Sequence, residues 1–398
     1  MNKITSAIFR ESYKKIPYLL LLALLGFYFF EITYLQSTFS KHPWIAGDWL
    51  INYSGGLIRR GFIGSLIIWW TENFNQQPLT ILLGIKKSLY LIWLISFYVL
   101  ALRKKIGLFE LILSLSPWAF LFDLHDPQGS GRKELILFSV FTIYLLLTNL
   151  TWKEDRKLIK NWQFYFLLIT LPLMTMIHEG LFFFFPFFFI THLKNGFQKD
   201  QLRVVIIPYF LSFIILLVLY FRYGGDPEIA NSICKNLTAN NLPDSICNGS
   251  INSISNLNIE FNFLYLKTYI PIFLLTFIPL FIYIKLAVPD NLIGLYCKSF
   301  IFILSLTLPL YFIAIDWGRW IHISAILMFT SILGIKSNIL RLSIRQIIGT
   351  LIAGYFYIFY WIIPHSIGGL NTVNWLKSIP DNPKVFFDLK KTWMQIKD

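Results

Sequence analysis

The sequence predicts an all-helical protein that crosses a membrane many times as one helical bundle. Two observations lead to this fold class. Of the 398 residues, 56% are hydrophobic and only 14% are charged, whereas an ordinary soluble domain has about 25% charged residues. The hydrophobic residues also gather in long runs between short polar segments, which is typical of a polytopic membrane protein. This composition excludes a soluble enzyme, a disordered chain and a disulfide scaffold.

The apolar runs predict about eleven membrane crossings, because a helix needs about 20 mostly apolar residues to span the hydrocarbon core. We expect them over residues 16–36, 82–102, 106–122, 135–150, 163–178, 180–193, 204–222, 263–285, 296–315, 320–335 and 346–364. The third, fourth, fifth, sixth and tenth runs are short, so their polar ends are expected to enter a cavity lined by protein. No internal repeat divides the chain, which predicts a single transmembrane domain over residues 1–398.

The basic residues predict the orientation, because lysine and arginine are enriched in cytoplasmic loops. More than half of the 35 basic residues fall in loops on the side of the N-terminus. The net charge of +14 therefore reflects topology and not a nucleic-acid surface, since these residues form no single stripe. We expect a cytoplasmic N-terminus and an outer C-terminal tail at 365–398, although that tail carries five lysines.

Two long outer loops are expected, at about 37–81 and 223–262. The first contains an apolar segment at 62–70 that is too short to cross as a helix and ends in a tryptophan pair suited to the headgroup region. We interpret it as an interfacial helix in the outer leaflet; a hairpin of two poorly formed spans is the alternative. The second loop contains Cys234 and Cys247, for which a disulfide and two free thiols are both open.

Four polar segments are candidate functional sites, because ionisable residues close to the hydrocarbon are costly and often functional. All four are expected on the outer side, at residues 47–61, 123–134, 178–180 and 316–320. Their candidate residues are Asp48, Arg59, Arg60, Asp126, Arg132, Lys133, His178, Glu179, Asp316 and Arg319.

This combination of residues suits an anionic substrate. Arginine binds phosphate oxygens through two parallel hydrogen bonds, and the glycines at 55–56 and in the 129–131 turn allow backbone amides to approach a phosphate. A carboxylate can accept the proton of a sugar hydroxyl as that hydroxyl attacks. No nucleotide-binding motif and no cysteine–histidine cluster for a metal occurs in the sequence.

Each segment also has a structural interpretation that needs no substrate. These are a solvated acid (Asp48), headgroup anchors (Arg59 and Arg60), a turn capped by Asp126 with Arg132 paired to Glu134, a hydrogen-bonded pair (His178 and Glu179) and an i,i+3 salt bridge (Asp316 and Arg319). Contacts between the four segments would favour one shared functional site over these separate structural roles.

The layout resembles the membrane glycosyltransferases with the GT-C type of fold. The strings Asn-Tyr-Ser-Gly-Gly-Leu-Ile-Arg-Arg-Gly at 52–61 and Asp-Trp-Gly-Arg-Trp at 316–320 also look like those in membrane proteins of bacterial O-antigen and capsule clusters, some of which are labelled repeat-unit polymerases of the Wzy type. The resemblance implies a GT-C-like fold in the bacterial inner (plasma) membrane, with its site at the periplasmic face. It implies a polyprenyl-phosphate or -diphosphate glycan as substrate and membrane lipid as surroundings, with no nucleic acid.

The resemblance also implies roles for the candidate residues. These are acceptor activation (Asp48, with Glu179 or Asp126 as alternative bases), acceptor orientation or deprotonation (His178 with Glu179) and binding of the substrate and its phosphates (Arg59, Arg60, Arg132, Lys133, Asp316 and Arg319). The first-loop motif departs from its common paired-acid form, because glycine precedes Asp48 and tryptophan follows it. This departure is the reason for keeping the two alternative bases.

The expected function is therefore a glycosyltransferase for surface polysaccharide, which either adds one sugar or joins repeat units as a polymerase. A transporter or flippase of a lipid-linked or anionic solute is the alternative, and it predicts charged groups at mid-depth with access from both sides. A non-catalytic scaffold is the third hypothesis. No cofactor is indicated, a divalent metal stays open, and the sugar, linkage and oligomeric state have no signal in the sequence.

Overall fold

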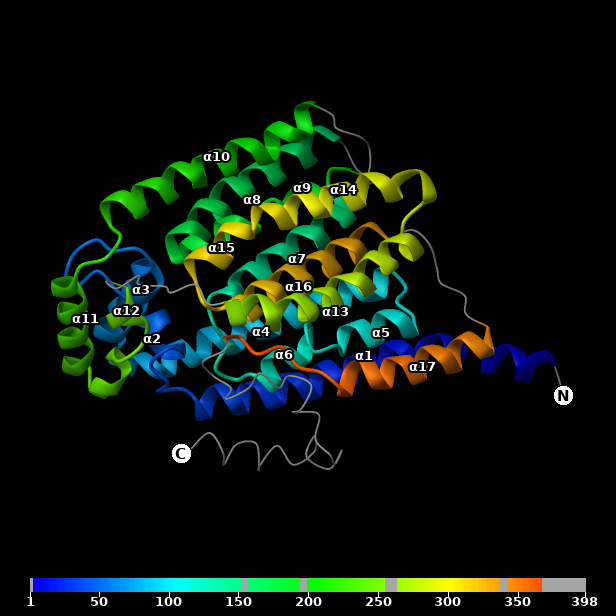
Figure 1. The fold of residues 1–398 in the computed structure, drawn as a ribbon, viewed down its shortest axis with the longest axis horizontal. Coiled ribbons are helices and arrows are strands. Elements are labelled where there is room, and N and C mark those ends of the chain that lie inside the picture. The colour runs from blue at the N-terminus through cyan, green and yellow to red at the C-terminus, as the bar shows by residue number, and fades with distance from the viewer. Residues whose placement is uncertain (1–2, 152–155, 194–198, 255–262, 337–342, 367–398) are drawn as a thin grey trace.

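The computed structural model is built from helices throughout the residues that it describes, namely 3–151, 156–193, 199–254, 263–336 and 343–366 (Figure 1). The helices are α1 (Lys3–Thr38), α2 (Ile45–Leu50), α3 (Gly61–Phe74), α4 (Pro78–Arg103), α5 (Leu108–Ser114), α6 (Phe120–His125), α7 (Glu134–Thr151), α8 (Arg156–Ile177), η1 (Glu179–Phe184), α9 (Phe187–Ile190), α10 (Lys199–Arg222), α11 (Pro227–Ala239), η3 (Asp244–Cys247), α12 (Ser250–Ser253), α13 (Phe263–Ala287), α14 (Asp290–Leu306), α15 (Leu308–Ile313), α16 (Trp317–Ile335) and α17 (Ile344–Phe359). The predicted all-helical class is confirmed for this part of the chain. Most of the expected tail, 367–398, and residues 255–262 of the second outer loop lie outside the described residues.

Six helical segments in the described ranges are long and apolar enough to cross a membrane by length and composition. They are Ile16–Thr38 of α1, α4, Arg203–Arg222 of α10, Tyr265–Ala287 of α13, Asp290–Ile313 across α14 and α15, and α16. Parts of α7 and α8 and the segment Glu179–Ile190 are apolar but shorter. Large aromatic side chains are exposed on the outside of the bundle, for example Phe30, Phe221 and Phe302. Such an apolar exterior is what a lipid environment requires, so the chain is a polytopic helical membrane protein.

Helix α16 is the centre of the bundle. Every residue from Trp317 to Ile335 is buried, and the helix packs against α4, α7, α9 and α13. A helix that is buried around its whole circumference must lie inside a larger bundle. Its first turn carries Arg319, so this central helix brings a buried cation to one end of the molecule.

Three of the expected spans are not continuous helices. The run 296–315 is divided at Thr307 between α14 and α15. The run 106–122 folds as α5 and α6 with a break around Pro117, and the run 180–193 folds as η1 and α9 with a break around Pro186. Proline lacks a backbone N–H, and its ring clashes with the preceding helical turn, which explains the interruption at both positions. The runs 106–122 and 180–193 are therefore each two short helical pieces and not one continuous helix.

The expected outer loops form a small helical unit at one end of the bundle (Figure 1, left). The interfacial segment predicted at 62–70 is helical and belongs to α3, whose Trp69 and Trp70 are exposed. Helices α2 and α3 from the first loop share a buried apolar cluster with α11 and α12 from the second. A disulfide joins Cys234 to Cys247 within the second loop.

Candidate functional site

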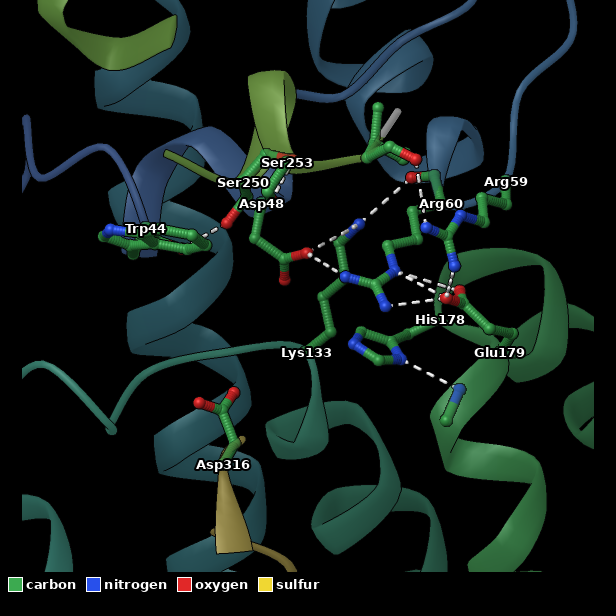
Figure 2. Close-up of polar contacts among 12 residues, drawn as sticks. Trp44, Asp48, Arg59, Arg60, Lys133, His178, Glu179, Ser250, Ser253 and Asp316 are labelled. Carbon is green, nitrogen blue, oxygen red and sulfur yellow. Dashed lines mark hydrogen bonds and ion pairs between the residues drawn. The ribbon is translucent and has the colours of Figure 1, made fainter. Parts of the chain in front are cut away.

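The four polar segments meet at the end of the bundle that carries this helical unit, because ion pairs connect them. Asp48 of the first segment lies 4.0 Å from the ammonium of Lys133 in the second. Glu179 of the third segment pairs with Arg60 of the first. The fourth segment joins through Arg319, which pairs with a glutamate at the start of α7. These pairs join the four segments into one connected group of charges, which leaves out the candidates Asp126 and Arg132, and Figure 2 shows its centre.

Glu179 holds the two arginines that precede α3. Its Oε1 atom accepts hydrogen bonds from Arg59 Nη1 at 3.0 Å and from Arg60 Nη2 at 2.6 Å. Arg60 Nε adds a bond to Glu179 Oε2 at 3.0 Å, so this pair has the two-pronged geometry that a guanidinium prefers with a carboxylate. Arg59 also donates to the backbone oxygen of Ile254 at 3.1 Å. Both arginines are thus engaged by protein groups.

Arg60 adopts an unusual backbone conformation, with φ at 66° directly before α3 begins. Residues other than glycine seldom occupy this left-handed region, and such strain concentrates at functional sites. The conformation places the guanidinium between two acids, with Nη1 3.6 Å from Asp48 Oδ1 while the other nitrogens bind Glu179. The Arg60 side chain is 26% exposed and that of Asp48 only 2%. Arg60 therefore covers the buried aspartate.

Asp48 has lone pairs that no described residue uses. It belongs to the short helix α2, and neither of its carboxylate oxygens has a hydrogen-bond partner among the described residues. Burial alone raises the pKa of Asp48, but the charge of Lys133 and the other nearby cations outweighs burial and holds this pKa well below its ordinary value. The group is therefore a charged carboxylate with free acceptor capacity. A buried group of this kind calls for an explanation such as a ligand or a catalytic role.

Lys133 and His178 flank this carboxylate and differ in charge. Lys133 is fully buried, its Nζ donates to the backbone oxygen of Arg60 at 3.0 Å, and burial lowers its pKa to about 8. Burial, followed by the charge of Arg60, lowers the pKa of His178 to about 3, so its imidazole is neutral near pH 7. His178 Nδ1 accepts from Gly180 N at 3.0 Å, which leaves the proton on Nε2. His178 is thus suited to donate a hydrogen bond and poorly suited to act as a base.

Arg319 is held by two acids. Its Nε and Nη2 atoms donate to Glu134 at 3.2 and 3.0 Å, and its Nη1 atom pairs with Asp316. The i,i+3 salt bridge expected at this helix start is present. The pairing of Glu134 with Arg132, proposed above as a structural alternative, is wrong, because Glu134 binds Arg319 instead.

Asp126 lies outside this connected group. Its Oδ1 accepts from Gly129 N at 3.0 Å, as expected for a residue that caps a turn. Its Oδ2 accepts from the backbone N–H of His365 at 2.6 Å and lies 2.6 Å from His365 Nδ1. Asp126 therefore ties the turn to the segment that follows α17, which leaves it less free to act as a base than Asp48.

Arg132 is a buried cation without an acid. Its residue is 6% exposed, its Nη2 donates to the backbone oxygen of Gln128 at 3.2 Å, and its Nε has no partner in the described part of the chain. Sequence reasoning missed a second cation of this kind, Lys86 on α4, which is 1% exposed. Its position inside the apolar run 82–102 was the available signal, because an ionisable residue within a span usually has a function.

Nothing in the described ranges groups three or more histidine, cysteine, aspartate or glutamate side chains in a way that could hold a metal ion. What the site does offer is an unsatisfied carboxylate beside Lys133, with further cations close by. A carboxylate of this kind can orient and deprotonate a hydroxyl, and the cations can stabilise negative charge on a leaving group. No family model, curated protein or solved structure matches the chain. The function must therefore be inferred from this chemistry.

Proposed function

We propose that the protein is a membrane glycosyltransferase that acts on polyprenyl-phosphate-linked glycan in surface polysaccharide synthesis. The observation that carries this proposal is the buried Asp48 carboxylate, which has no hydrogen-bond partner in the described residues and lies between Arg60 and Lys133. An acid with free acceptor capacity beside cations matches the two needs of the reaction. These needs are a proton acceptor for the attacking hydroxyl and positive charge for the departing phosphate.

In the proposed reaction, the hydroxyl oxygen of the acceptor forms a bond to the anomeric carbon of the donor. The bond from that carbon to the lipid phosphate oxygen breaks, and the oxygen keeps the electron pair. Asp48 accepts the hydroxyl proton. Its low pKa makes it a weak base, but a phosphate bound nearby would offset the charges of Arg60 and Lys133 and so raise the pKa of Asp48.

The proposal includes the topology. The N-terminus is cytoplasmic, the site lies at the periplasmic face of a bacterial inner membrane, and the chain crosses that membrane about eleven times in a GT-C-like arrangement. The Lys/Arg distribution supports this orientation. The exposed Trp69 and Trp70 on α3 support a position of this helix at the outer headgroup region.

The transporter alternative predicts charged groups at mid-depth and access from both sides, so a ligand should also find polar groups toward the opposite end of the bundle. The charged pair there is Glu110 with Lys336, and both side chains are buried. Unlike Asp48, this carboxylate is fully engaged, since Tyr283 donates to Oε1 at 3.1 Å and the backbone N–H of Gly107 donates to Oε2 at 2.9 Å. A satisfied pair of this kind fits a structural clasp, so the charge distribution favours the transferase.

Deletion of the gene in its own host tests the proposal, with surface polysaccharide and lipid-linked intermediates sized by gel and mass spectrometry. Single repeat units in place of long chains would identify a polymerase, and a repeat unit that lacks one sugar would identify a monosaccharide transferase. Complementation with Asp48→Asn should fail, whereas Asp290→Asn, an exposed acid at the start of α14, should restore the glycan. An unchanged glycan after deletion would exclude the enzyme and favour transport.

A further inference from the structure

The cations around Asp48 fall into two classes according to whether an acid lies within ion-pair distance. Arg59 and Arg60 pair with Glu179, Arg319 pairs with Glu134, and Lys133 lies 4.0 Å from Asp48. Lys86 and Arg132 are equally buried, yet neither forms an ion pair with any described residue. Six cations thus share four nearby acids (Asp48, Glu134, Glu179 and Asp316), and the excess positive charge resides on these two side chains.

A short chain of hydrogen bonds brings Lys86 next to the turn that carries Arg132. Lys86 Nζ donates to Gln36 Oε1 at 2.9 Å, and Gln36 Nε2 donates to Ser130 Oγ at 3.0 Å. Ser130 stands two residues before Arg132. A lysine ammonium has three donor hydrogens, so the bond to Gln36 leaves two of them for another acceptor.

The aromatic ring of Trp49 lies against the same turn and fixes its distance from Lys86. Trp49 Nε1 donates to the backbone oxygen of Gly131 at 3.0 Å, and Lys86 Nζ lies 6.0 Å from the centre of the Trp49 ring. Gly131 has a φ of 63°, and a Cβ atom there would lie 2.2 Å from Gln36 Oε1. Only glycine allows the turn to approach Gln36 so closely. Trp49 is also the neighbour of Asp48 in α2, and Arg132 is close enough that its charge lowers the pKa of Asp48.

The pKa of His42 is affected by the positive charges of these two cations. Burial, followed by the charges of Arg132, His365 and Lys86, lowers the pKa of His42 to about 4. Its Nδ1 has no hydrogen-bond partner in the described ranges. An excess of buried positive charge is costly when nothing compensates it, and an anion bound here would remove that cost.

We infer that Lys86 and Arg132 form a buried binding site for a phosphate-type anion, a phosphomonoester or diphosphate group, beside Asp48. Arg59, Arg60 and Arg319 hold the surrounding segments together through their acids and do not supply the primary phosphate contacts. The inference deepens the proposed function and rests on it for the identity of the natural ligand. The binding of the anion itself does not depend on glycosyl transfer.

Binding to the purified full-length chain in neutral detergent tests this inference. The probes are sodium diphosphate and a polyprenyl diphosphate in mixed micelles, titrated at constant ionic strength by calorimetry and by the shift in unfolding temperature. Lys86→Met and Arg132→Met should each weaken binding about tenfold or more, since each removes a charge-assisted contact. They should also unfold at the same or a higher temperature than the wild type without ligand, because each removes an uncompensated buried charge.

Two lysines supply matched controls. Lys87→Met changes the exposed lysine next in sequence to Lys86 and should bind as the wild type does. Lys336→Met changes an equally buried lysine that is paired with Glu110. This variant should unfold at a lower temperature but should bind the probes as tightly as the wild type does. If Lys86→Met fails to fold, Lys86→Arg, which keeps the charge, should fold and retain binding.

The outcomes distinguish a free diphosphate from a lipid-linked one as the bound anion. They also separate the anion-site inference from the proposed transferase function. Binding of both probes means that the diphosphate group itself is recognised, and binding of the lipid probe alone means that the prenyl chain is needed as well. Both outcomes support the site if the Lys86→Met variant binds the probe more weakly than the wild type does. Wild-type binding in Lys86→Met and Arg132→Met, or no binding of either probe to the wild type, overturns it. Binding in a protein whose deletion leaves the glycan unchanged would keep the anion site and reject the transferase.

Discussion

Asp48 Oδ1 lies 4.0 Å from the ammonium of Lys133, which is within ion-pair range but too far for a hydrogen bond. Lys133 instead donates to the backbone oxygen of Arg60, and the Asp48 oxygens have no hydrogen-bond partner in the described ranges. The two side chains are fully buried. The Asp48 oxygens therefore keep their capacity to accept a hydrogen bond from another group, and this arrangement motivates the first prediction.

Replacement of Asp48 by asparagine should abolish activity while the protein remains folded. The amide has nearly the shape of the carboxylate, so packing is kept, but it cannot accept the proton of an attacking hydroxyl. Loss of a general base reduces rates by about 10²–10⁴-fold. The check is the amount of long glycan per amount of protein in membranes. Normal glycan from the Asp48→Asn variant at normal abundance would assign the base elsewhere, with Glu179 the next candidate.

The buried histidines predict that the protein is less stable in mild acid. The pKa of His178 is lowered to about 3 and that of His42 to about 4, whereas both ordinarily titrate at 6.5. Below pH 6.5 the unfolded chain binds protons that the folded chain excludes, so the free energy of unfolding falls as the pH is lowered from 6.5 toward 4.5. His178 alone contributes a slope of about 1.4 kcal/mol per pH unit.

The measurement is the unfolding midpoint in detergent across this pH range. His178→Gln should give a shallower slope, because glutamine does not titrate. Replacement of the exposed Asp290 by asparagine should leave the slope as it is. A midpoint that is independent of pH between 6.5 and 4.5 would contradict the neutral, buried imidazole.

Arg319 and Glu134 should show strong coupling in a double-mutant cycle. The two residues are 185 positions apart in the chain, and their buried pair joins the start of α16 to the start of α7. Arg319→Met should lower the free energy of unfolding by about 3 kcal/mol, because it leaves the buried Glu134 carboxylate unpaired. Glu134→Gln should lower it by less, because Arg319 keeps its pair with Asp316. The double variant should lose less than the sum of the two. Additive losses would mean that the two charges do not interact.

Hydrophobic runs predicted the long uninterrupted helices because their apolar length exceeds what a span requires. They could not predict the breaks at Pro117 and Pro186, since proline does not always interrupt a helix. Helix α10 continues through Pro208, and α13 continues through Pro271. Neighbouring helices decide whether the freed backbone groups find new partners, and that information is not local in the sequence.

The candidate residues could be named from the sequence, but their pairings could not. Glu134 stands two positions from Arg132, and residues at this spacing do not face each other on a helix. Its partner is Arg319 on a central helix, which only the three-dimensional packing brings near. Lys86 was missed because one lysine near the start of a span also fits a residue that reaches the membrane surface. Its burial shows that it faces inward.

The disulfide between Cys234 and Cys247 yields a prediction about both stability and topology. Its sequence separation is 13 residues, and a cross-link that closes a loop of about 15 residues stabilises a fold by about 3 kcal/mol. Disulfides persist only in oxidising compartments, so the bond should form only if the loop that carries it is periplasmic. Cys297 is free and serves as an internal standard.

Labelling with a maleimide-polyethylene glycol in denaturant, with and without prior reduction, checks this prediction. Unreduced protein extracted from membranes should gain one adduct, at Cys297, and reduced protein should gain three. In a Cys297→Ser variant the numbers should be zero and two, which assigns the protected pair. Cys234→Ser should lower the unfolding temperature. Three adducts before reduction would mean that the loop never meets an oxidising compartment, and the candidate site, which packs against the same helical unit through α2, would then face the cytoplasm.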